Sequence, residues 1–265
     1  MRTAAILLIA LCGIVAATLV GVALDARKRR RRSYEPLVDP IMPAPGGVDV
    51  SVLRIAIDGR ASKFVRTELA RIMASIDGTS AQGRSKRLRE VSVTLRRVRD
   101  SWIYGGAVND PIRDHADARA AFAWHVDDAR VRFTTAAVPL GNPRDPQTTL
   151  ILVTIVVAAR GELATVGEIG AGEELRRALE AAAHREADDI VALEVVWVPE
   201  EDGRVLSSIQ LEAQYPPPEL YRLRGAVVGN VYCTYCGGPF PAELVSCPHC
   251  GAPARGRDRD RQAIA

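Results

Sequence analysis

An uncharged apolar run at residues 3–24 is the feature that most constrains this chain. A helix rises about 1.5 Å per residue, so the run is long enough to cross the roughly 30 Å hydrocarbon core of a bilayer. Six consecutive basic residues at 27–32 follow the run, whereas Arg2 alone precedes it. Positively charged flanks stay on the cytoplasmic side of a membrane. We therefore predict one transmembrane helix in the cell membrane, with the soluble part of the chain in the cytoplasm.

A cleaved signal peptide is the alternative interpretation of the same run. Such a peptide needs basic residues before a shorter apolar stretch and a small-x-small cleavage site after it. Here the order is inverted, because the charges follow the run and Asp25 stands where cleavage would occur. The sequence therefore favours a membrane anchor.

Composition divides the rest of the chain. Residues 33–47 contain four prolines and two glycines, which predicts a semi-extended linker. The total of 265 residues leaves room for one globular domain and one small module. The predicted organisation is a membrane anchor with its basic flank at 1–32, a Pro-rich linker at 33–47, an α/β domain at 48–218, a zinc ribbon at 230–253 and a disordered tail at 254–265.

Hydrophobic periodicity predicts the elements in the first half of the domain. Alternating apolar residues indicate a strand, and apolar residues at helical spacing indicate amphipathic helices. The predicted elements are a strand at 48–57 and helices at 61–76, 80–100 and 116–133. In the last of these helices we expect Phe122, Val126 and Val131 to be buried.

An aromatic motif lies between the second and third predicted helices. Trp102 and Tyr104 are two residues apart, and Gly105 and Gly106 follow them. Aromatic side chains so placed usually close a hydrophobic core. We interpret the motif as two core residues that precede a glycine turn.

Two long apolar runs, at 150–158 and 190–198, predict strands that are covered on both faces. The segment between them has Glu173 and Glu174 in the first turn of an amphipathic helix, where carboxylates stabilise the positive end of the helix dipole. A strand, a helix and a second strand at this spacing predict a βαβ crossover with parallel, neighbouring strands. The expected fold class is therefore α+β with a βαβ unit.

Charge is distributed unevenly along the chain. Residues 49–147 carry 17 basic and 12 acidic side chains, whereas residues 148–250 carry 7 and 15. Two such halves can pair with each other, or the basic half can lie on anionic lipid. The predicted helix at 80–100 has seven basic residues that could bind phosphate in lipid or nucleic acid. We favour pairing between the halves and a solvated face for this helix.

Glu194 is the one charged residue in the second apolar run. A buried carboxylate without a partner would have a raised pKa and could do acid–base work. The simpler interpretation, which we favour, is an exposed glutamate or one paired with an arginine. A cleft holding Glu194 beside an arginine would strengthen the case for an enzyme.

Several of these residues also carry a resemblance to a known family. The residues are 153–159 with Gly161, 191–199, Tyr215 with Pro216, and the earlier aromatic motif at 102–105. Over roughly residues 48–217 the chain resembles membrane-associated proteins, best represented in cyanobacteria and chloroplasts, that are catalogued as the domain of unknown function numbered fifteen-seventeen. The resemblance implies an α/β architecture and a membrane association, but no reaction and no catalytic residues. The Pro-rich linker and the cysteine module described next depart from the family, so a photosynthetic role does not carry over.

Cys233, Cys236, Cys247 and Cys250 form two CxxCG knuckles separated by ten residues. Four thiolates at about 2.3 Å in a tetrahedron make a closed structural Zn²⁺ site, and the glycine after each pair permits a tight turn. We predict these four residues as the metal ligands and structural Zn²⁺ as the cofactor; iron in a rubredoxin-like site and disulfides are the alternatives. The module resembles short zinc ribbons appended to many prokaryotic membrane and regulatory proteins. We expect His249 to point to solvent rather than to bind the metal.

These features predict a single-pass, membrane-anchored interaction or scaffold protein of unknown biochemical activity, whose ribbon docks protein partners. The alternatives are an enzyme with an active site that the sequence does not reveal, or a nucleic-acid-binding regulator. Residues 233–250 contain no Lys or Arg, which makes nucleic-acid binding by the ribbon the weaker alternative. We find neither a phosphate loop nor a nucleophile elbow, so we do not predict an enzyme.

Overall fold

The fold is seen in a computed structural model that describes residues 47–133, 149–161, 172–200, 206–223, 231–241 and 244–254. The predicted transmembrane helix at 3–24, its basic flank, the linker up to residue 46 and the tail from residue 255 lie outside the described residues. Among the residues that the structure does describe, none of the helices has the length and apolar character required to span a membrane.

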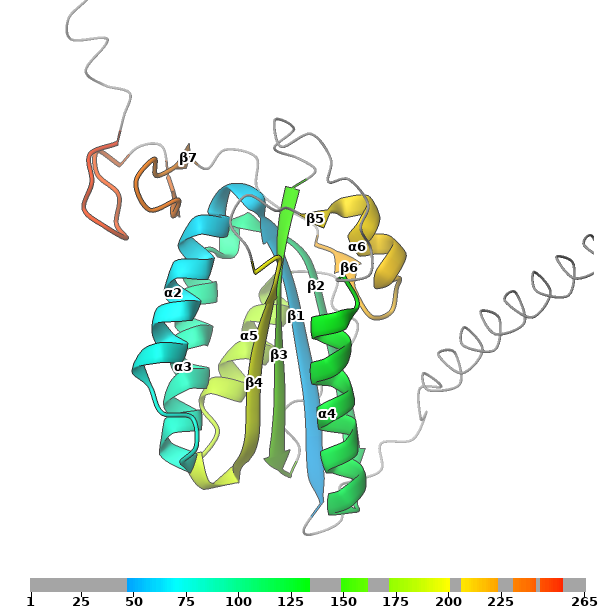
Figure 1. Ribbon diagram of the computed structural model, residues 1–265. Helices are drawn as coiled ribbons and strands as arrows, with labels where there is room; N and C mark the ends of the chain where they lie inside the picture. The colour runs from blue at the N-terminus through cyan, green and yellow to red at the C-terminus, as the bar shows by residue number, and fades with distance from the viewer. Residues whose placement is uncertain are drawn as a thin grey trace, which may run out of the picture. The chain divides into compact units, whose positions relative to one another are not determined.

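A six-stranded antiparallel sheet forms the centre of the domain (Figure 1). The strand order is β4-β3-β1-β2-β6, and β5 pairs with the start of β3. The strands are β1 (Val48–Asp58), β2 (Trp102–Ile112), β3 (Thr149–Arg160), β4 (Ile190–Val198), β5 (Leu206–Ser207) and β6 (Tyr221–Arg222). Every residue of β1 is buried, because β1 has a strand on each side and helices over both faces.

Helices cover both faces of this sheet. They are α2 (Ser62–Ser75), α3 (Ala81–Arg97), α4 (His115–Val131), α5 (Gly172–Ala183) and α6 (Ser208–Gln214). Figure 1 shows α2, α3 and α5 on one face and α4 on the other. Successive residues of a strand point to opposite faces. Accordingly, Leu53 and Ile55 of β1 pack with α2, α3 and α5, whereas Val50 and Val52 pack with α4.

The predicted helix at 80–100 is confirmed as α3. Its expected apolar stripe, made of Leu88, Val91, Leu95 and Val98, is completely buried. The helix begins after Ser80, whose hydroxyl accepts a hydrogen bond of 3.0 Å from the backbone N–H of Gly83. A serine in this position satisfies one of the N–H groups that the first helical turn leaves unpaired.

The prediction of which α4 residues are buried is confirmed in part. Val126 is buried, but Val131 has 55% of its surface exposed. The buried residues of α4 are Ala118, His125, Val126 and Ala129. Because three of these four are an alanine or a polar residue, a search for large apolar side chains does not find this face.

The predicted parallel βαβ crossover is wrong, since β3 and β4 are antiparallel neighbours. Helix α5 begins beside Trp102 of β2, at the end of the sheet where β3 starts, and it ends near Arg185, whose guanidinium donates to the Arg160 carbonyl at the end of β3. The helix therefore returns the chain to the end of the sheet where β3 stops. From there β4 can only run back along β3 in the opposite direction.

The prediction that β4 is covered on both faces is also wrong. β4 is the last strand in the sheet order, and several of its residues are only partly buried. Its apolar composition resembles that of the central strand β3, so composition alone does not separate an edge strand from a central one.

The predicted glycine turn at residues 105 and 106 is instead the middle of strand β2. A methyl group on Gly105 would lie 2.7 Å from a side-chain carbon of Leu175 on α5, and one on Gly106 would lie 2.1 Å from the carbonyl oxygen of Glu219. Glycine inside a strand commonly marks such a close approach of another element. These two glycines let α5 and the segment before β6 pack directly on the strand.

The two oppositely charged halves of the chain do pair with each other. Ion pairs join Arg96 to Glu180 at 2.9 Å and Arg132 to Glu219 at 3.6 Å. In addition, the guanidinium of Arg84 donates to the Ile190 carbonyl of β4 at 2.9 Å. Part of the basic charge on α3 therefore interacts with other groups of the same chain.

Candidate metal centre

Two knuckles of identical backbone geometry bring the four cysteines together. The module contains a small hairpin of β7 (Val231–Tyr232) and β8 (Pro239–Phe240). In each knuckle, the N–H of the glycine bonds to the carbonyl of the first cysteine, at 2.8 Å for Gly237 and 2.9 Å for Gly251. Both glycines have a positive φ, 77° and 75°, which L-residues with a side chain rarely adopt. The glycine in each CxxCG sequence is therefore required by the turn.

The sulfur atoms have the spacing that a tetrahedral metal site requires. All four Sγ atoms lie within 4.8 Å of one another. The Sγ atoms of Cys233 and Cys250 are 3.7 Å apart, as are those of Cys236 and Cys247. Four ligands at about 2.3 Å from one ion stand about 3.8 Å apart in a tetrahedron. A disulfide would require about 2.05 Å, so the cysteines are free thiols arranged to bind a metal ion.

Burial and hydrogen bonds act in opposite directions on these thiols. Burial raises the pKa of Cys233, but hydrogen bonds from the backbone N–H groups of Cys236 and Tyr235, together with those to the thiols of Cys250 and Cys236, lower it to about 7. Burial is the main cause that raises the pKa of Cys236 and Cys247 above the usual thiol value. A metal ion bound by all four sulfurs would displace these protons, because only the thiolate is a strong ligand.

His249 does not point to solvent, as the sequence had suggested. Its ring lies 4.6 Å, centre to centre, from the ring of Phe64 on α2, and its Nε2 atom is 2.8 Å from the carbonyl oxygen of Pro239. It also remains outside the cysteine cluster. His249, one of the two residues between the cysteines of the second knuckle, thus packs the module against the domain.

Other contacts fix the first knuckle to the start of α2. The Lys63 ammonium donates to the Tyr235 carbonyl at 2.9 Å. A methyl group on Gly237 would lie 3.3 Å from Lys63 Cβ, so the knuckle and the helix are in close contact. The four cysteines therefore lie on a module that packs directly against α2.

Tyr232 of β7 extends the same interface. The guanidinium carbon of Arg60, in the 3-10 turn Gly59–Ala61, lies 4.4 Å from the centre of the Tyr232 ring. The Tyr232 hydroxyl is 3.2 Å from the hydroxyl of Ser101, and burial raises the pKa of Tyr232 above its usual value. Tyr232 packs against the main core of the domain.

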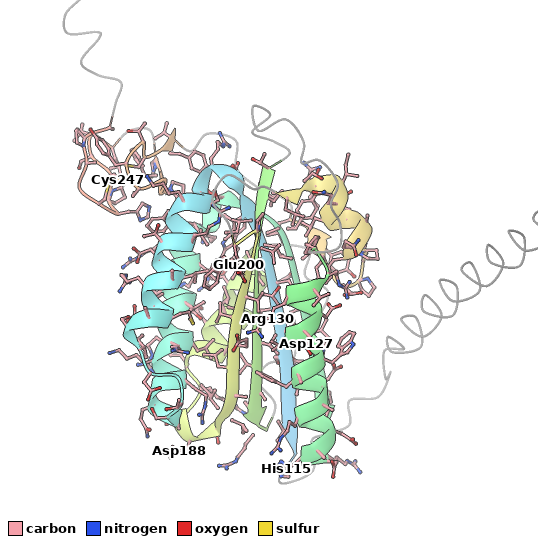
Figure 2. The ribbon with its side chains drawn as sticks, viewed as in Figure 1. His115, Asp127, Arg130, Asp188, Glu200 and Cys247 are labelled. Carbon is pink, nitrogen blue, oxygen red and sulfur yellow. The ribbon has the colours of Figure 1, made fainter. Side chains whose placement is uncertain are left out.

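A second candidate site is a hollow of about 390 Å³ beside Glu194. Its lining consists of residues 193–197 of β4, Glu200, Met73 of α2, Arg87 of α3 and Arg130 of α4. Arg130 and Glu200 are labelled in Figure 2. Glu194 forms an ion pair with Arg130, and their side chains are 36% and 52% exposed. The simpler interpretation of Glu194, a glutamate paired with an arginine, is confirmed.

The structure brings together all four cysteines that were predicted from the sequence. Glu194 is not among them and lies on the edge strand β4. Sequence analysis missed the residues that support both sites: Arg60, Lys63 and Phe64 for the cysteine module, and Arg130 for Glu194. Phe64 is recognisable in sequence only as a core residue of a helix, and no spacing connects Arg130 to Glu194. These contacts depend on tertiary structure alone.

Fold and site together define an α+β domain that carries, at its C-terminal side, a module whose four cysteines could bind a metal ion. Residues 47–223 match the family described as "Protein of unknown function (DUF1517)", and the chain belongs to this family. Protein FLAP1 homolog A from the cyanobacterium Synechocystis sp. is 29% identical over 195 residues, which are 66% of this chain and 58% of that protein. The chain thus spans less than two thirds of the length of this curated relative. No solved structure matches the chain.

Proposed function

We propose that this protein is a membrane-anchored, cytoplasmic interaction protein, and that its C-terminal ribbon is folded by a structural Zn²⁺ ion and docks a protein partner. The observation that carries this proposal is the four-thiol cluster in a module that packs against α2.

A structural role suits the metal centre because four thiolates fill all positions of a tetrahedral ion. Soft thiolate ligands select zinc or iron among the common metals. A segment of about twenty residues cannot bury enough surface to fold alone, so the metal would supply its folding free energy. The chain's own contribution is to hold the sulfurs at their spacing through the two glycine turns.

Exposed side chains of the ribbon support partner docking. Three large ones are exposed, Tyr235 at 51%, Leu244 at 43% and Val245 at 65%. Other groups of the module, among them the Tyr235 carbonyl and the His249 ring, are occupied by contacts with α2. Tyrosine is enriched among the residues that contribute most of the binding free energy at protein interfaces, and neighbouring contacts help to exclude water.

The apolar run at 3–24 and the basic block at 27–32 support the anchor and the cytoplasmic location. No reaction is part of the proposal. Nucleic-acid binding ranks lower because the ribbon lacks Lys and Arg between residues 233 and 250.

Site-specific photocrosslinking in native membranes tests the docking role. A photoreactive amino acid at Val245 should give a discrete adduct with one protein, and the adduct should be lost when Cys247→Ser removes a metal ligand. The same amino acid at Ile209 of α6, which is 78% exposed and distant in sequence, serves as the matched control. Equal adducts from Val245 in both backgrounds would show that docking does not depend on the metal site, and no more adduct from Val245 than from Ile209 would show that the ribbon is not a docking module.

An enzyme is the second candidate function, favoured by the hollow that holds Glu194 beside Arg130. Both side chains of this pair are substantially exposed, at 36% and 52%, as in an ordinary surface ion pair, which places this candidate second. Native mass spectrometry of the purified full chain tests it. A small molecule that is retained by the wild type and lost in Glu194→Gln would move the enzyme to first place.

A further inference from the structure

Strand β4 is an edge strand without the usual protection against pairing. Among the described residues it pairs with β3 alone. Edge strands normally carry several charges, a proline or a covering element, because their free N–H and C=O groups attract other strands. Within β4 the only charged residue is Glu194, and Arg130 already neutralises it.

The hollow beside β4 lies at the edge of the strand and not over one of its faces. It touches five consecutive residues, 193–197. Because side chains alternate between the two faces of a sheet, a hollow over one face would touch every second residue only. Contact with all five places the hollow against the backbone itself, where every second residue presents an N–H and a C=O away from β3.

Helices from both layers flank this edge. Met73 and Arg87 line the hollow from α2 and α3, and Arg130 lines it from α4 on the other face. As a result the middle of the edge strand is recessed: Val195 and Val196 are 7% and 5% exposed. A second copy of the chain would present an equally recessed edge, so the two edges could not meet. A single extended segment can enter where a whole sheet cannot.

The two sides of the hollow differ in chemistry. Toward α2 and α3 it offers the apolar side chains of Met73, Leu193 and Trp197. Arg87 also lines this side, and its guanidinium donates to the backbone carbonyls of Met73 and Ile76. Toward α4 it offers the charged pair of Arg130 and Glu194. A strand added to β4 would place its own side chains alternately on these two sides. The complementary ligand therefore alternates apolar and polar residues.

We propose that the free edge of β4 is a docking site for an extended peptide segment of a partner protein, with apolar residues at alternate positions, which binds by adding a strand to the sheet. This mode of recognition takes its affinity from main-chain hydrogen bonds and its selectivity from alternate side chains. Five residues at about 3.4 Å each give a footprint of roughly 17 Å. The proposal is independent of the ribbon and concerns a second binding surface.

The test uses the full chain in detergent and a labelled nine-residue peptide that alternates valine and threonine, with lysine at both ends. Two further versions carry N-methyl groups on alternate backbone amides. One is methylated at the odd-numbered residues and the other at the even-numbered residues, so that only one of them is methylated on the amides that face β4. Methylation in the phase that faces β4 removes the donors and should weaken binding at least about tenfold, whereas methylation in the other phase should change it less than about twofold. Fluorescence anisotropy measures the three affinities.

Matched variants of the protein locate the site. Leu193→Lys introduces a charge into the hollow and should weaken binding about tenfold or more. Val191→Lys changes a residue of the same strand that is 44% exposed and outside the lining, and it should have little effect. Cys247→Ser should leave peptide binding unchanged, so that failure of this proposal and failure of the ribbon's docking role are separate results.

No binding of the unmethylated peptide, or equal affinity for the two methylated versions, would overturn the proposal. So would a chain that dimerises with increasing concentration while the β4 amides become protected from hydrogen exchange, since that result would assign the edge to a second copy. If Leu193→Lys does not fold, the two methylated peptides still decide the question with the wild-type protein.

Discussion

At the scale of single residues, the four thiols matter as a set. One thiol cannot hold a structural metal ion by itself, whereas four with a spacing of 3.7 Å within two pairs could bind one ion together. Removing one ligand leaves three thiolates and opens a position to water, which weakens the site and removes the folding free energy that it supplies.

We therefore expect the wild-type chain to purify with about one equivalent of Zn²⁺, and Cys236→Ser to lose it. Cys12→Ser is the matched control, since Cys12 lies in the apolar run and outside the cluster. Elemental analysis of protein purified without added metal measures both. Iron in place of zinc would contradict the assignment of the metal, and full metal content in Cys236→Ser would contradict the assignment of the ligands.

Two tryptophans provide a second test at the residue scale. Trp102 is 2% exposed, and its ring N–H donates to the Leu95 carbonyl at 3.1 Å, whereas Trp197 lies half-buried at the β4 hollow. Trp102→Ala should lower the free energy of unfolding by about 3–5 kcal/mol. Trp197→Ala should cost clearly less, because part of its ring is already in water.

Urea unfolding followed by circular dichroism compares the two variants with the wild type. Equal losses, or a larger loss for Trp197→Ala, would mean that the edge of the sheet is better covered than the structure indicates.

At the scale of elements, the ribbon and the start of α2 form one unit of packing. Lys63 and Phe64 hold the two knuckles, and Tyr232 reaches the main core. The metal keeps the knuckles in the shape that makes these contacts. Its loss should therefore loosen the beginning of α2 as well as the ribbon.

Hydrogen exchange measured with and without a strong zinc chelator checks this expectation. Chelation should increase exchange in β7, β8 and the first turn of α2, and leave α4, on the opposite face of the sheet, unchanged. An unchanged α2 would show that the ribbon contacts the domain without stabilising it. Increased exchange throughout the domain would instead make the metal a requirement for the whole fold.

The sequence predicted most elements of the fold, because their periodicity is strong. β1, α2, α3, β3, α5 and β4 lie where the alternation or the helical stripe placed them. It did not predict the direction of β4, since direction depends on where α5 starts and ends rather than on local pattern. Nor did it predict β2 beyond its aromatic start, because Gly105 and Gly106 resemble a turn until the close packing of α5 is known.

The candidate metal site could be predicted almost completely, and the edge site could not. The CxxCG spacing encodes the turn and the ligands within a few residues. Glu194 stood out in sequence as a lone charge, but its partner Arg130 is 64 residues away, with β3 and α5 between them along the chain. Burial and the edge position are properties of the assembled sheet.

At the scale of the whole molecule, the proposed anchor decides where all of these surfaces operate. The run at 3–24 is the only membrane signal that the sequence analysis identified. A chain that begins at Ser33 should therefore move from the membrane fraction to the soluble fraction, while full-length Cys12→Ser should stay in the membrane. Fractionation after a high-salt wash measures both. A shortened chain that remains in the membrane until the salt wash would point to the basic face of α3 as a second, electrostatic attachment.

The position of the ribbon along β1 determines how far the ribbon lies from the N-terminal end of the domain. The chain enters the domain at Gly47, directly before β1, whereas the ribbon packs on the 3-10 turn that directly follows the other end of this strand. The 11 residues of β1 span roughly 35 Å. The sheet therefore acts as a rigid spacer between the tether and the ribbon. A partner bound by the ribbon therefore stays about the length of β1 away from Gly47, where the chain enters the domain. This distance does not depend on the length of the linker before Gly47.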